Sequence, residues 1–70
     1  MGTQDCKTQS ELEDALLTEL CREAGDIGPD EELIEGARAN HDSEDIAEAA
    51  RGDVAALIRL RMAFGLPIFG

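Results

Sequence analysis

The most reactive side chains of this sequence are the thiols of Cys6 and Cys21 and the imidazole of its single histidine, His41. Together with Asp45, Cys21 and His41 supply ligand types that bind zinc, but no pair of them has the close spacing of a structural zinc site. A nucleophilic cysteine needs a neighbouring base and a loop that positions both, and no strand-borne loop is evident. We therefore expect no catalytic residue, no metal centre and no cofactor, and we expect His41 at a helix end or in the core.

The same cysteines indicate the compartment. Cys6 lies in a polar N-terminal stretch and Cys21 in a helical pattern, and two cysteines make no disulfide framework. Free thiols in a reducing cytosol are the simpler interpretation. The N-terminus has no apolar run of the kind found in signal peptides, and the apolar C-terminal stretch is too short for a bilayer span. We therefore predict a cytoplasmic protein with no membrane partner.

A serine in an acidic helical chain is a possible attachment point for a prosthetic group. Asp42-Ser43 precedes Glu44-Asp45 at the start of a helical pattern, and this arrangement resembles the attachment site of acyl carrier proteins. The resemblance implies a carrier domain in which Ser43 bears phosphopantetheine. The sequence departs from the carrier pattern at Glu44, where an apolar residue is expected. Asp42-Ser43 is also an ordinary helix cap, so the carrier domain is a second alternative.

A first alternative function comes from residues 44–64, where Gly52-Asp53-Val54 separates two helical patterns. The arrangement resembles a helix-turn-helix that reads DNA, and the ending Gly65-Leu66-Pro67-Ile68 is similar to the turn after the recognition helix in phage excisionase and small-terminase domains. The resemblance implies that the second of the two helices lies in the major groove, with Arg59 and Arg61 facing phosphates or base edges. The glycine comes one place late for the usual pattern, and no wing follows.

Charge is strongly segregated along the chain. All 16 acids lie in residues 1–53 with four basic residues, which makes a net charge of −12, whereas residues 54–70 hold only Arg59 and Arg61 and are mostly apolar. The excess of negative charge argues against nucleic acid and anionic membranes as partners. It suits a basic protein partner, including one whose usual ligand is a nucleic acid that the acidic surface would mimic.

Helix signals account for about half of the acidity. Ser10-Glu11-Leu12-Glu13 predicts a capping box, and Gly25 predicts the end of that helix. Pro29 predicts the first position of a second helix, and Ser43 predicts the cap of a third. Half of the acids fall in the first turns of these helices, where the helix dipole favours them: Glu11, Glu13, Asp14, Asp30, Glu31, Glu32, Glu44 and Asp45.

The C-terminal third leaves one structural question open. Gly52 disfavours a helix interior and Asp53 is a good N-cap, so residues 44–64 form either one long helix or two helices at 44–51 and 54–64. The last helix is apolar most of the way round, so it is expected to be buried or to face a partner. Gly65 and Pro67 end it.

No alternation of apolar and polar residues indicates a strand, so the sequence predicts an all-α fold, a small bundle of three to four short helices. A flexible segment at residues 1–9 would precede a single helical domain at residues 10–70. A core of this size rarely supplies more than about 3–5 kcal/mol of net stability. With no disulfide or metal expected, self-association is the remaining source of stability, and we predict a homodimer.

The charge layout predicts a non-enzymatic protein–protein interaction module, such as a bacterial or phage regulator, inhibitor or assembly factor. Its acidic face would engage a basic partner and comprises Glu31, Glu32, Glu35, Asp42, Glu44, Asp45 and Glu48. Its apolar C-terminal surface would make a dimer or partner contact and comprises Leu57, Ile58, Leu60, Met62, Phe64, Leu66, Ile68 and Phe69.

Overall fold

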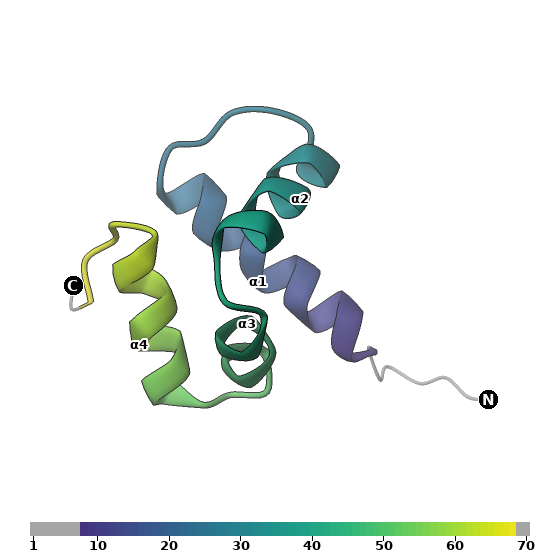
Figure 1. Cartoon of the computed structure of the whole chain (residues 1–70). Helices are drawn as coiled ribbons and strands as arrows, with labels where there is room; N and C mark the ends of the chain where they lie inside the picture. The colour runs from purple at the N-terminus through teal and green to yellow at the C-terminus, as the bar shows by residue number, and fades with distance from the viewer. Residues whose placement is uncertain (1–7, 69–70) are drawn as a thin grey trace.

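The computed structural model describes residues 8–68, which form four α-helices and no strand. The helices are α1 (Gln9–Glu23), α2 (Asp30–Asn40), α3 (Ser43–Ala50) and α4 (Val54–Ala63). The predicted all-α bundle is therefore confirmed. α1 runs through the middle of the molecule and packs on α2 and α3, and α4 packs mainly on α3 (Figure 1). Most of the predicted flexible segment, residues 1–7, lies outside the described residues.

The N-terminal caps differ from the predicted ones by one or two residues. Thr8 caps α1, because its hydroxyl accepts from the Glu11 amide at 3.2 Å and the Glu11 carboxylate accepts from the Thr8 amide at 3.0 Å. The predicted capping box of Ser10 and Glu13 is therefore wrong, and Thr8 and Gln9 belong to the helical domain. In the sequence, Thr8 and Ser10 are each followed by an acid three residues later. Thr8 and Glu11 form the capping box, which makes the helix two residues longer.

The starts of α2 and α3 also differ from the predicted ones, by one residue each, whereas the start of α4 does not. The Asp42 carboxylate accepts from the Glu44 amide at 2.8 Å and caps α3, so Ser43, predicted as the cap, is its first helical residue. Pro29 is the N-cap of α2 and not its first helical residue. Asp53 caps α4 as predicted, since its carboxylate accepts from the amides of Ala55 and Ala56.

Residues 43–63 form two helices, which settles the open question. Gly52 has φ +101°, a left-handed conformation that a residue with a Cβ rarely adopts. There the Gly52 amide donates to the Ala49 carbonyl and the Asp53 amide donates to the Glu48 carbonyl, both at 3.0 Å. This Schellman motif stops α3. Gly25 and Gly65, the predicted stops of α1 and α4, end their helices in the same way.

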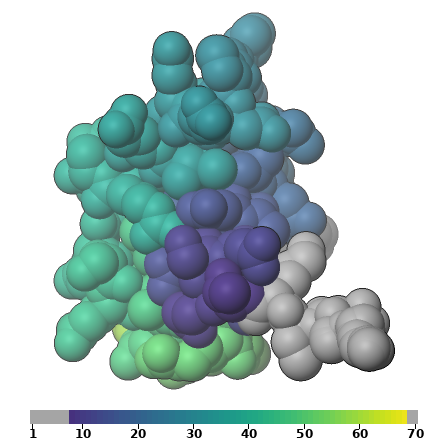
Figure 2. Space-filling view, turned by 90° about the vertical axis from the view of Figure 1, so that its right-hand side faces the viewer, coloured from purple at the N-terminus to yellow at the C-terminus, as the bar shows by residue number. Residues whose placement is uncertain are grey.

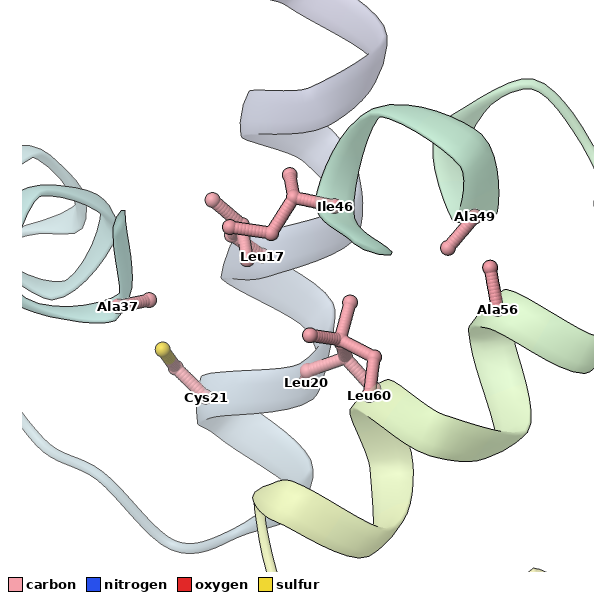
Figure 3. Close-up of a cluster of buried hydrophobic side chains, with 8 residues drawn as sticks. All are labelled: Leu17, Leu20, Cys21, Ala37, Ile46, Ala49, Ala56 and Leu60. Atoms are coloured by element: carbon pink, nitrogen blue, oxygen red, sulfur yellow. The ribbon is translucent and has the colours of Figure 1, made fainter. Parts of the chain in front are cut away.

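The core lies where α1, α3 and α4 meet. Leu17 and Leu20 of α1 face Ile46 of α3 and Leu60 of α4, and all four are at most 2% exposed (Figure 3). Smaller residues complete the cluster: Cys21, Ala37, Ala49 and Ala56. Ala49 and Ala56 point toward each other between α3 and α4, where their small size allows the helices to approach closely (Figure 3).

His41, at the end of α2, contacts Phe64, at the end of α4. Their rings stack with centroids 4.1 Å apart and an interplanar angle of 9°. α2 ends at Asn40, and His41, the next residue, has an extended backbone. Its ring reaches Phe64, the C-cap residue of α4. The histidine thus lies at a helix end, as predicted, and serves packing.

Ion pairs of four arginines link the helices. Arg38 of α2 binds Glu13 and Asp14 of α1, with both N–O distances at 2.8 Å. The remaining ion pairs are Arg22–Asp30 across the α1–α2 loop, Arg59–Asp45 and Arg59–Glu48 between α4 and α3, and Arg61–Glu23 between α4 and α1. Arg61 also donates to the Pro67 carbonyl at 2.7 Å and so fixes the tail after α4. Each arginine therefore holds two segments together.

Replacing Asp53 with alanine tests the start of α4. Asp53→Ala removes the acceptor for two amides, and we expect a loss of about 1 kcal/mol in the free energy of unfolding. For a domain of this size that lowers the melting temperature by about 4–8 °C in thermal denaturation followed by circular dichroism. Asp53→Asn keeps a capping oxygen and is the matched control. An equal drop in both variants would contradict a role as cap.

Candidate interaction surfaces

The predicted acidic face divides into two groups once its hydrogen bonds are known. Asp45 and Glu48 bind Arg59, with the Asp45 carboxylate 3.1 Å and the Glu48 carboxylate 3.4 Å from its guanidinium. Asp42 caps α3. Each of these three acids already makes a contact within the fold, so less of its charge is available to a partner, and their assignment to a partner-binding face stays a prediction. Glu44 is exposed in the first turn of α3, so it can still contribute its negative charge to a partner-binding face.

The acids of α2 are in a different situation. Glu31, Glu32 and Glu35 are exposed, and none makes an ion pair with a cation of residues 8–68. Asp30, at the start of the same helix, is already paired with Arg22. Side chains of α2 stand out from the body at the top of Figure 2. The negative charge that the arginines leave uncompensated therefore has its densest group on α2.

Beside these acids the surface is hollowed. An open depression of about 340 Å³ is lined by two acids and an apolar residue of α2 and by one ion pair, namely Glu31, Glu35, Ile34 and the pair Asp14–Arg38. Ile34 gives it an apolar patch, and Glu31 and Glu35 give it unpaired carboxylates. An apolar wall beside carboxylates suits the stem and head of a lysine or arginine side chain. Ile34 and Asp14 were not predicted as site residues, because only the packing of α1 on α2 brings them together.

The Arg38 pair fixes the geometry of this depression. Gln9 donates to Glu13 at 2.9 Å and to the Ala47 carbonyl at 3.0 Å, so α3 is tied into the same network. The hydrogen bonds from Gln9 and Arg38 lower the pKa of Glu13 below its usual value. The hydrogen bonds that Arg38 donates to Asp14 and Glu13 raise the pKa of Arg38. Both groups are therefore charged in the folded protein at neutral pH.

The apolar C-terminal surface is partly a core surface. Leu60 is only 1% exposed and packs against α1, so its assignment to an interface is wrong. Its position on the face that meets α1 outweighs its place in an apolar run. Leu57, Phe64 and Leu66 are half-buried against the same core. Ile68 is half-buried, and Phe69 lies outside the described residues.

What remains exposed on α4 is a narrower set. Val54 is 67% exposed and Met62 61% exposed, with the half-buried Ile58 between them in the sequence. Val54 was absent from the predicted surface, although its spacing of four residues from Ile58 was a usable signal. We call Val54, Ile58 and Met62 the outer stripe of α4.

The candidate DNA-contacting arginines are both bound to acids. Arg59 pairs with acids of α3, and both terminal nitrogens of Arg61 donate to the Glu23 carboxylate at 2.8–2.9 Å. α3 and α4 do have the short connection of a helix-turn-helix. Contact with phosphates would require these arginines to leave carboxylate partners in a chain of formal net charge −10.

Within residues 8–68, the remaining reactive groups are not assembled into a site. Cys21 is a buried free thiol whose pKa is raised chiefly by burial, so it is a poor nucleophile at neutral pH. Within residues 8–68, no three potential ligands among histidine, cysteine and acidic residues lie close enough to hold a metal ion. Ser43 is exposed at the start of α3, and exposed Glu44 follows it. None of the described helices is long and apolar enough to cross a membrane.

No protein-family model matches this chain, and no curated protein and no solved structure matches it either. The function has to be inferred from the chain's own surfaces.

Stability below pH 5 tests the Glu13 contacts. Because the folded-state pKa of Glu13 lies below its usual value, its contribution to stability is complete above the unfolded-state pKa and is lost as the pH falls through the folded-state pKa. We expect Glu13→Gln to cost about 1 kcal/mol at pH 7, measured by urea unfolding. The gap between wild type and variant should narrow as the pH falls from 5 to 3.

The matched control is Glu19→Gln, which removes the same charge from an exposed carboxylate in the middle of α1 that has no ion-pair partner among residues 8–68. Its stability should not fall at pH 7. A Glu13→Gln gap that persists unchanged at pH 3 would contradict the ionic role of Glu13.

Proposed function

We propose that this chain is a non-enzymatic interaction protein that binds a basic protein partner through α2, and that its last helix makes an apolar contact with a second copy or with the partner. A small cytoplasmic regulator, inhibitor or assembly factor of bacterial or phage type fits these properties. The observation that carries the proposal is the group Glu31, Glu32 and Glu35, which is exposed and has no cation partner within residues 8–68.

The small number of basic residues, most of which are paired within the fold, supports this proposal. The chain has 16 acids and six basic residues, and four of the arginines are used inside the fold. Leaving acids unpaired costs stability through mutual repulsion. A basic partner would relieve that repulsion and would gain association rate from electrostatic attraction. The partner's positive surface is of the kind that also binds nucleic acid, so the chain would compete with nucleic acid for it.

The depression beside α2 gives the contact a shape as well as a charge. Ile34 offers an apolar patch for an aliphatic stem, while Glu31 and Glu35 offer acceptors for its charged end. An arginine or lysine of the partner would therefore bind here better than at an isolated surface carboxylate.

A labelled arginine-rich peptide, titrated with the full chain and followed by fluorescence anisotropy, tests the proposal. Binding should weaken as salt rises, because the attraction is screened. Glu31→Gln and Glu35→Gln should each weaken binding about two- to fivefold, the range of an exposed ion pair.

Glu19→Gln is the matched control, since Glu19 is an exposed acid of α1 that does not line the depression. An equal loss in all three variants would show attraction to net charge alone and would overturn the assignment to α2. Duplex DNA in place of the peptide should give no binding at low salt, whereas retention of DNA would favour the helix-turn-helix alternative.

A further inference from the structure

We propose that the outer stripe of α4 is a self-association surface, on which two copies of this chain pack their α4 helices antiparallel about a two-fold axis through Ile58. The proposal specifies the apolar contact of the proposed function and rests on it only for the role of the last helix. The partner is a second copy, and the contact leaves the acidic face of α2 free.

Buried and exposed residues of α4 lie on opposite sides of the helix. Ala56 and Leu60 are buried on the side that meets the core, while Val54 and Met62 are 67% and 61% exposed. Residues four apart form one ridge along a helix. The outer stripe is such a ridge, and α4, which carries it, lies at an edge of the molecule and packs mainly on α3 (Figure 1). Large apolar side chains at three successive ridge positions are unusual for a face that meets only water.

The outer stripe is symmetric in spacing about its central residue. The ridge has Ile58 at its centre, with Val54 four residues before it and Met62 four residues after it. A two-fold contact requires a surface that is complementary to itself. In an antiparallel pair centred on Ile58, the two isoleucines meet and each Val54 faces the Met62 of the other copy. Ridges of this kind pack into each other's grooves at a crossing angle of about −50°.

The segment that carries the outer stripe lacks acidic residues. Residues 54–70 contain no acid, and the nearest one in sequence, Asp53, is occupied in capping its own helix. Arg59 is held by Asp45 and Glu48. Two copies with a formal net charge of −10 each repel on any approach that brings their α2 acids together. The outer stripe is a face through which they meet without opposing carboxylates. A basic partner, in contrast, is drawn to α2.

The proposed contact is small. A specific interface buries about 1,000 Å² in total, or about 500 Å² from each copy. The outer stripe spans nine residues of helix, about 12 Å along its axis, with Val54 and Met62 more than half exposed and Ile58 half-buried. The exposed Ala55 beside it lets the backbones approach. A contact built on this stripe lies at or below the weak end of stable dimers, so the monomer should appear on dilution.

Sedimentation equilibrium of the full chain over a concentration series tests the proposal. We expect a monomer–dimer equilibrium that shifts toward dimer when salt rises from 0.05 to about 0.5 M, because repulsion between the copies is screened. Binding of the basic peptide weakens over the same salt range. Failure of one proposal is therefore distinguishable from failure of the other.

Charge insertion locates the interface. Ile58→Glu should weaken dimerisation at least tenfold, and Met62→Glu, at a more exposed position that tolerates a polar residue in the monomer, should do the same. Ile27→Glu adds the same charge at a residue that is 96% exposed in the α1–α2 loop, and it should leave the dimer unchanged. Circular dichroism verifies that each variant is folded. A wild-type chain that stays monomeric at every concentration and salt overturns the proposal, as do Ile58→Glu and Met62→Glu variants that dimerise as tightly as the wild type.

Cross-linking tests the antiparallel register. In a Cys6→Ser background, Cys21 is buried, so an introduced cysteine is the accessible thiol among the described residues. Ile58→Cys should form a disulfide-linked dimer under mild oxidation, because the two residues meet at the axis. Val54→Cys should not link to itself, because the two copies of that residue lie about 12 Å apart along the helices. Equally efficient linkage of both variants would overturn the antiparallel arrangement.

Discussion

Burial of one apolar stripe of α1 is the interaction on which this structure depends. Leu17 and Leu20 face Ile46 of α3 and Leu60 of α4 in the buried cluster (Figure 3). A fully buried leucine contributes about 1.5–3 kcal/mol. The rest of the cluster is one cysteine and three alanines, which contribute far less each. The fold therefore has little to spare, and its other features supplement a small core.

The arginines are the main supplement, and their use determines what the surface can do. Exposed ion pairs contribute little individually, but Arg38, Arg59 and Arg61 each join two helices and remove acids from the surface field. What they leave uncompensated is concentrated on α2. What the small core leaves uncovered is concentrated on α4. Charge and apolar area thus reach the solvent on separate helices, and the two kinds of contact need not compete.

Local signals in the sequence predicted the helices well and their exact starts less well. Gly25 and Gly65 each ended a helix as predicted, and Gly52, where one helix or two had been left open, ended α3, because a left-handed residue is needed at that point and glycine supplies it. Caps were misplaced where two candidates stood close together, as with Asp42 and Ser43. Either residue can accept the amide hydrogen bond, and neighbouring packing decides between them.

Contacts between helices were beyond the reach of the sequence pattern. Helical spacing puts Leu60 and Met62 in one apolar segment, and only the position of α1 shows that the first is core and the second surface. The acids of α3 illustrate the same point. Asp45 and Glu48 look as available as Glu31 until Arg59 is placed opposite them. The candidate surfaces are therefore the acids and apolar residues that tertiary contacts leave unused.

The Schellman turn at Gly52 also bears on how the chain reaches this structure. It joins α3 to α4 through three residues, so their contacts close only a short loop of chain. Short loops lose little entropy on closure, and proteins rich in such local contacts fold in microseconds to milliseconds. We expect α3 and α4 to pair early as a helical hairpin, with α1 then docking on the apolar side that the hairpin presents. For a protein with so small a core, rapid refolding limits the time for which the apolar C-terminal residues are exposed together.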